Sequence, residues 1–81
     1  MTSMTKELRK TVNDKDIRKN ITKIYFVEGD EREDEKDYYE IYFKEETVKS
    51  VYSCEYITST TCPADLDINE WLKEIVFIEE V

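Results

Sequence analysis

The ten residues from Glu28 to Asp37 hold the densest group of side chains that could do chemistry in this chain. Seven of them are carboxylates, and only Arg32 and Lys36 oppose that charge. Carboxylates at such density repel one another, so the segment favours binding a cation or a basic partner. Apolar and aromatic segments flank the run, which predicts a loop held on a folded scaffold. The carboxylates are Glu28, Asp30, Glu31, Glu33, Asp34, Glu35 and Asp37.

Calcium is the first cation to consider for this run. The acids beginning at Asp30 approach the alternating ligand spacing of an EF-hand loop. Arg32, however, stands where a ligand belongs, and Glu35 replaces the glycine that the sharp turn requires. We therefore expect no dedicated metal site and no cofactor, with weak Ca²⁺ association as the remaining alternative. Cys54 and Cys62 are expected to be reduced thiols, the default in a cytosolic chain, with a disulfide as the alternative if the chain is secreted. Zinc is not expected, because no histidine and no C-x-x-C pair accompanies them.

Catalysis finds little support in the residue inventory. The chain has no histidine, so the Ser-His and Cys-His couples cannot form. Its one glycine, Gly29, excludes a glycine-rich phosphate loop. Paired carboxylates exchange protons usefully only in a desolvated cleft, and a chain of 81 residues has little room for one. We expect a protein that is not an enzyme and has no catalytic residues.

The charge balance bears on the class of partner. Residues 1–23 carry seven bases and three acids, a net of +4, whereas residues 24–81 carry five bases and seventeen acids, a net of -12. Direct nucleic-acid binding is not expected, because most of the chain would repel phosphates. No stretch approaches the roughly 18–20 apolar residues of a membrane span, and no signal-peptide apolar region follows the N-terminal charges. We expect a cytoplasmic protein with no membrane partner.

The elements that must position the acidic run predict one α+β domain over residues 1–81. It comprises a short N-terminal helix, a three-stranded antiparallel β-sheet and a C-terminal helix packed on one face. The helix is predicted over residues 5–12 from the spacing of its apolar residues. Strands are predicted over residues 20–28, 37–44 and 47–58, which are rich in β-branched and aromatic side chains.

The C-terminal helix has the clearest local signals. Asp67 and Glu70 have the spacing of a capping box, and Leu66 and Trp71 occupy the positions of a hydrophobic staple. A wide apolar stripe at helical spacing follows, and we expect it to supply much of the core. The pattern of residues 75–81 fits either a continued helix or an edge strand.

The strand predicted over residues 37–44 has two alternating sets of side chains. If the apolar set faces the core, then Tyr38, Glu40 and Tyr42 point outward as a Tyr-Glu-Tyr row beside the acidic loop. Tyrosine is suited to such a surface because it supplies a large contact area with few rotatable bonds. The predicted partner-binding residues are therefore Asp30, Glu31, Glu33, Asp34, Glu35, Asp37, Tyr38, Glu40 and Tyr42.

With the acidic run Glu28 to Asp37, the adjoining Tyr38-Tyr39-Glu40 and the later acids, the chain resembles phage-encoded inhibitors of host defence nucleases. Anti-CRISPR proteins and DNA-mimic inhibitors are examples of this class, and the likeness is one of composition without a family motif. The resemblance implies non-catalytic inhibition in the host cytoplasm of a basic nucleic-acid-handling protein, such as a nuclease or a CRISPR effector with its guide RNA. The alternatives are an acidic interaction or immunity subunit without such a target and, third, a weakly Ca²⁺-associating protein. The sequence leaves the oligomeric state open.

Overall fold

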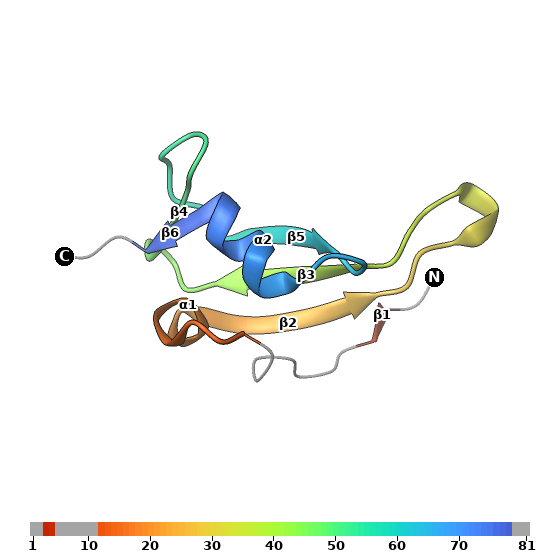
Figure 1. Ribbon diagram of the computed structural model, residues 1–81, viewed down its shortest axis with the longest axis horizontal. Helices are drawn as coiled ribbons and strands as arrows, with labels where there is room; N and C mark the ends of the chain where they lie inside the picture. The colour runs from red at the N-terminus through yellow and green to blue at the C-terminus, as the bar shows by residue number, and fades with distance from the viewer. Residues whose placement is uncertain (1–2, 5–11, 79–81) are drawn as a thin grey trace.

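The computed structural model describes residues 3–4 and 12–78, and it confirms an α+β fold (Figure 1). The helix predicted over residues 5–12 lies, apart from Val12, outside the described residues. In chain order the elements are β1 (Ser3–Met4), α1 (Lys15–Lys19), β2 (Ile21–Val27), the 3-10 turn η2 (Glu31–Glu33), β3 (Tyr38–Phe43), β4 (Val48–Ser50), β5 (Ser59–Pro63), α2 (Ile68–Ile75) and β6 (Val76–Ile78).

The predicted three-stranded antiparallel sheet is present as β2, β3 and β5, with the short β1 on the outer edge of β2. The β2–β3 pairing runs from Ile21 opposite Phe43 to Val27 opposite Tyr38. A β-bulge interrupts it between Ile21 and Lys23. Because a bulge adds one residue to a strand, Ile21 and Ile24 are both buried although they are three positions apart.

The strand predicted over residues 47–58 is wrong beyond Ser50. The chain instead forms β4, turns back, and begins β5 only at Ser59. The Ser50 hydroxyl accepts bonds from the backbone N–H groups of Tyr52 and Ser53, at 3.2 and 3.4 Å, and Cys54 takes a left-handed φ of 58°. Serine side chains that bond nearby backbone stabilise turns against strands, so local hydrogen bonding here overrides β-propensity.

Residues 75–81 were expected to continue the helix or to form an edge strand, and the structure shows a strand as far as Ile78. Helix α2 ends at Ile75, and β6 then pairs antiparallel with β4 as a second, two-stranded sheet. The predicted N-cap is confirmed, because the Asp67 side chain accepts a 2.9 Å bond from the Asn69 backbone N–H. No helix within the described ranges is long and apolar enough to cross a membrane.

The hydrophobic core joins the main sheet to both helices and to the second sheet. Ile68 and Leu72 of α2 belong to it, and Trp71 packs half-buried against it. The Trp71 indole Nε1–H donates a 2.7 Å bond to the Thr61 carbonyl on the edge strand β5. The finer expectation, a C-terminal helix lying across one face of the sheet, stays a prediction. The buried core residues are Val12, Ile17, Ile21, Ile24, Ile41, Phe43, Val48, Cys62, Ile68, Leu72 and Val76.

Candidate functional site

The acidic run forms the connection between β2 and β3 and protrudes beyond the end of the sheet (Figure 1). Its own hydrogen bonds order it. The Asp30 side chain accepts a 2.9 Å bond from the Arg32 backbone N–H, and the Asp30 carbonyl accepts 3.0 Å bonds from the N–H groups of Glu33 and Glu35. Asp34 takes a left-handed φ of 57°. The carboxylates are thus carried on a defined turn, as the sequence predicted for a loop on a scaffold.

Gly29 lies where the two sides of this loop cross at close range. Its backbone N–H donates a 2.8 Å bond to the Asp37 carboxylate. A Cβ atom at Gly29 would lie 2.4 Å from the Glu35 carbonyl oxygen and 2.6 Å from the Lys36 carbonyl carbon. No side chain fits there without moving the backbone, so the chain's one glycine has a structural role.

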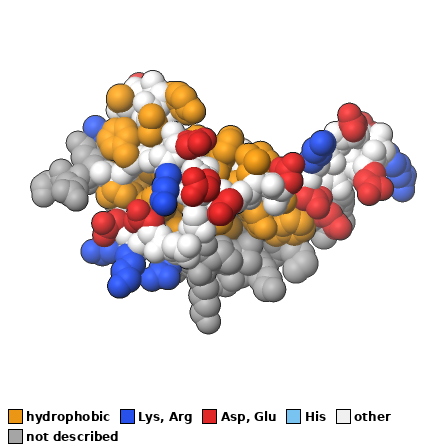
Figure 2. Space-filling view, in the orientation of Figure 1, with side chains coloured by type: hydrophobic (Ala, Val, Ile, Leu, Met, Phe, Trp, Pro, Cys, Tyr) orange, Lys and Arg blue, Asp and Glu red, His pale blue; other side chains and the backbone are white. Residues whose placement is uncertain are grey.

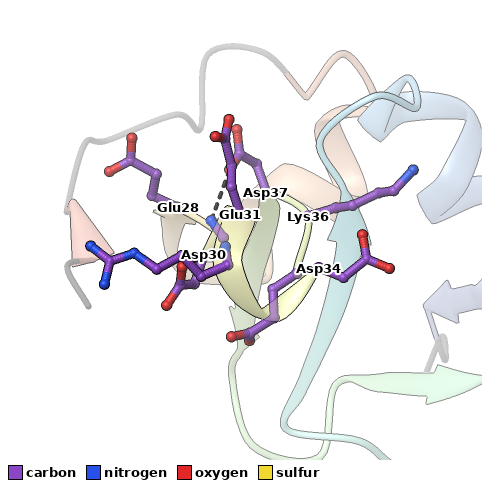
Figure 3. Close-up of a pocket in the computed structure, with 9 residues that line it drawn as sticks. Glu28, Asp30, Glu31, Asp34, Lys36 and Asp37 are labelled. Carbon is purple, nitrogen blue, oxygen red and sulfur yellow. Dashed lines mark hydrogen bonds between the residues drawn. The ribbon is translucent and has the colours of Figure 1, made fainter.

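Around this crossing, the loop residues line an open hollow (Figure 3). The Glu28, Asp30 and Asp34 carboxylates point in different directions, whereas those of Glu31 and Asp37 end next to each other in this view (Figure 3). Within residues 3–4 and 12–78, no group of three or more acids or cysteines is arranged to hold a metal ion. Six carboxylates and two bases line the hollow, a net of -4. The loop therefore acts chemically as a concentrated negative field.

The structure places Tyr38, Glu40 and Tyr42 on the sheet face opposite the buried Ile41 and Phe43. All three row residues are half-buried. Directly opposed residues in an antiparallel pair share a face, so the row continues across the sheet onto both neighbouring strands. Its neighbours are Val27, Tyr25 and Lys23 on β2, and Pro63, Thr61 and Ser59 on β5.

Sequence reasoning missed one part of this face. The Tyr25 and Tyr42 rings meet edge to face, with centroids 5.8 Å apart and planes at 71°. The Lys23 ammonium lies 5.4 Å from the Tyr25 ring centroid and 5.2 Å from that of Tyr42. The Tyr42 end of the row therefore carries a cation, whereas the Tyr38 end adjoins the acidic loop. The only sequence signal for this lysine–tyrosine contact was the Lys-x-Tyr spacing of Lys23 and Tyr25 within one strand.

A second surface, at the end of the molecule away from the acidic loop, is apolar. The turn after β4 exposes 79% of Tyr52 and 41% of Val51. Tyr56 and Phe77 flank Lys49, whose ammonium lies 4.8 Å from the Tyr56 ring centroid. Figure 2 shows hydrophobic side chains at this end and acidic ones at the protruding loop and across the middle of the view. The wrongly predicted strand over residues 47–58 concealed this surface.

Both cysteines are free thiols. Cys54 is exposed in the turn, and Cys62 is buried in the core. Burial raises the pKa of the Cys62 thiol to about 11, with smaller contributions from the nearby charges of Asp67 and Asp65. Because the thiolate is the nucleophile, Cys62 is chemically inert in the folded protein.

We define the acidic–aromatic face as the nine predicted residues: Asp30, Glu31, Glu33, Asp34, Glu35, Asp37, Tyr38, Glu40 and Tyr42. The structure brings them together on the β2–β3 hairpin, with six in the loop and three on β3. The acids of α2 belong to a different element and are not part of this hairpin. No protein-family model, curated protein or solved structure matches this chain.

Proposed function

We propose that this protein is a non-catalytic inhibitor that binds a basic, nucleic-acid-handling protein through its acidic–aromatic face. The carboxylates take the place of phosphates in the partner's groove, and the tyrosines supply contact area. A nuclease or a CRISPR effector with its guide RNA fits this description. The observation that carries the proposal is the continuity of the Tyr38-Glu40-Tyr42 row with the protruding acidic loop on one hairpin.

The geometry of the loop supports electrostatic capture. Its carboxylates are exposed or half-buried and project from an ordered turn (Figure 3). DNA carries one negative charge per roughly 1.7 Å of helix axis, so a groove built for phosphates attracts a surface of this sign. Steering by such charges raises association rates by about 10–10³ and weakens steeply with ionic strength. The loop's internal hydrogen bonds also reduce the ordering cost of binding.

The test combines capture with displacement. Tagged protein is incubated with nuclease-treated lysate at low and high salt, and each captured protein is purified and assayed for binding to a labelled duplex or guide RNA. The proposal expects salt-sensitive capture of a nucleic-acid-binding protein whose ligand this protein displaces. If a purified captured protein keeps its nucleic acid in the presence of excess inhibitor, mimicry is refuted.

Two variants of equal charge locate the determinant. Reversing Glu31, Glu33 and Asp34 to lysine alters the loop, whereas reversing Glu45, Glu55 and Glu74 changes the net charge equally on exposed positions elsewhere. Association should slow about tenfold or more in the first variant and far less in the second. Equal slowing in both would assign the effect to net charge alone.

The second candidate, an acidic interaction or immunity subunit without a nucleic-acid-binding target, is favoured by the apolar surface around Tyr52. Exposed apolar patches of this kind mark protein contacts. In the same displacement assay, this function predicts capture that survives high salt and depends on Tyr52. Replacing Tyr52 with serine would then abolish capture, while reversal of the loop charges would leave it intact.

A further inference from the structure

Four residues on the outer sheet face form a square of two adjacent cross-strand pairs. Lys23 opposes Tyr42, and Tyr25 opposes Glu40. Opposed side chains in such pairs have Cβ atoms about 4.5–5.5 Å apart, so Glu40 is the cross-strand neighbour of Tyr25, beside the contact of Lys23 with the two tyrosine rings. We call Tyr25, Tyr42 and Glu40 the cation seat, and Lys23 its internal occupant.

The internal occupant shows which ligand the seat accepts. The Lys23 ammonium lies within 6 Å of both ring centroids, at 5.4 and 5.2 Å. A cation at that range is attracted by the ring quadrupoles. Lys23 is nevertheless exposed, and its stem is flexible, so a cation from another molecule can exchange with it at low cost. Because the two rings already hold the Lys23 ammonium in the free protein, they are arranged to hold a cation from a partner in its place.

We propose that the seat receives an arginine side chain of the basic partner, which displaces Lys23 from the Tyr25–Tyr42 pair and places its guanidinium beside the Glu40 carboxylate. This inference rests on the proposed function and names the partner group that the acidic–aromatic face recognises. The acidic loop lies at the other end of the same hairpin, and its seven acids against two bases supply the charge complementarity that brings such a partner to this face.

Arginine fits the seat better than lysine for three reasons. Its guanidinium is planar and stacks on aromatic rings, it is more weakly hydrated than an ammonium, and its fork of donors matches a carboxylate. A partner lysine offers only what Lys23 already provides, so exchange brings it little gain. The seat therefore discriminates between two kinds of basic surface that the acidic loop attracts equally.

The exchange has a direct spectroscopic signature in the intact protein. With its ammonium 5.4 and 5.2 Å from the Tyr25 and Tyr42 ring centroids, Lys23 should have side-chain methylene resonances shifted upfield by the ring currents. Titration with an oligoarginine peptide should move these resonances back toward ordinary lysine values. An oligolysine peptide of equal length serves as the matched ligand, and it should leave them largely in place.

Three variants separate the seat from the loop. Lys23→Gln vacates the seat and should tighten oligoarginine binding about two- to fivefold more than Lys19→Gln, an equal charge change on α1. Tyr25→Leu with Tyr42→Leu should weaken oligoarginine binding on the order of tenfold. Glu31, Glu33 and Asp34 reversed together should weaken both peptides alike.

The outcomes are distinguishable. The seat is supported if the preference for oligoarginine is lost in the double leucine variant and raised in Lys23→Gln. The Lys23→Gln result remains valid even if the double leucine variant fails to fold. Equal binding of both peptides, unaffected by Lys23→Gln but abolished by loop reversal, overturns the seat and leaves the proposed function in place. Absence of binding by either peptide to the wild-type protein overturns both.

Discussion

Replacing Gly29 with alanine should destabilise the protein, and the sign of the effect is diagnostic. Where the native backbone tolerates a side chain, Gly→Ala stabilises a protein by about 0.4–1 kcal/mol through the unfolded state. An ordinary flexible-loop glycine would behave in that way. Gly29 should not, because its added Cβ would lie 2.4 Å from the Glu35 carbonyl oxygen.

The magnitude follows from what must move. The atoms nearest the new Cβ are backbone atoms of Glu35 and Lys36, so no side-chain rotation relieves the contact. Forcing extra atoms into packed structure costs about 1–3 kcal/mol. Separating the two sides of the loop also strains the 2.8 Å bond from the Gly29 N–H to Asp37, which is worth about 0.5–1.5 kcal/mol. Because the loop is exposed and can relax, we expect a net loss of about 1–3 kcal/mol.

Urea unfolding followed by Trp71 fluorescence measures this loss, with an unchanged slope indicating that compactness is preserved. Asp37→Ala is the matched variant, because it removes the hydrogen bond without adding a clash and should cost less than Gly29→Ala. A Gly29→Ala protein as stable as the wild type, or more stable, would refute the close crossing.

Three further predictions concern the core and the turn. Trp71→Phe should cost about 1–2 kcal/mol in urea unfolding, because it removes the bond to the Thr61 carbonyl, whereas Leu72→Ala at a fully buried position should cost about 3–5 kcal/mol. Equal losses would contradict this assignment. Alkylation of the native protein should modify Cys54 and spare Cys62 until unfolding, as read by mass spectrometry. Burial raises the pKa of Cys62 from 9.0 to about 11, so the unfolded chain loses this proton first and the free energy of unfolding falls as pH rises between those values; Cys62→Ala should lack that component.

The hairpin and its row were predictable because their signals are local. Strand alternation around Ile41 and the charge density of the adjoining run are both properties of a few consecutive residues. The α2 N-cap was predictable for the same reason, since Asp67 bonds a backbone N–H only two positions away. In each case the chemistry that decides the structure lies within one short window.

The remaining features depend on contacts that a linear reading does not supply. The Ser50 turn replaced a predicted strand because its hydroxyl bonds compete with β-propensity. The Gly29 crossing depends on where Glu35 passes, and the position of Lys23 over Tyr42 depends on the β2–β3 register below the bulge. Register is set by the whole ladder and its turn, so neighbours across it cannot be assigned from one strand.

The two ends of the acidic–aromatic face should act on different steps of binding. The exposed loop carboxylates attract a partner before contact, but at physiological ionic strength their influence fades beyond about 8 Å. The cation seat makes contact only after docking, because ring–cation attraction requires separations within about 6 Å. Loop reversal should therefore slow association in a salt-dependent way, whereas removing the Tyr25 and Tyr42 rings should speed dissociation at every salt concentration. If both changes act on association alone, the seat makes no contact in the complex and the tyrosines serve only the sheet.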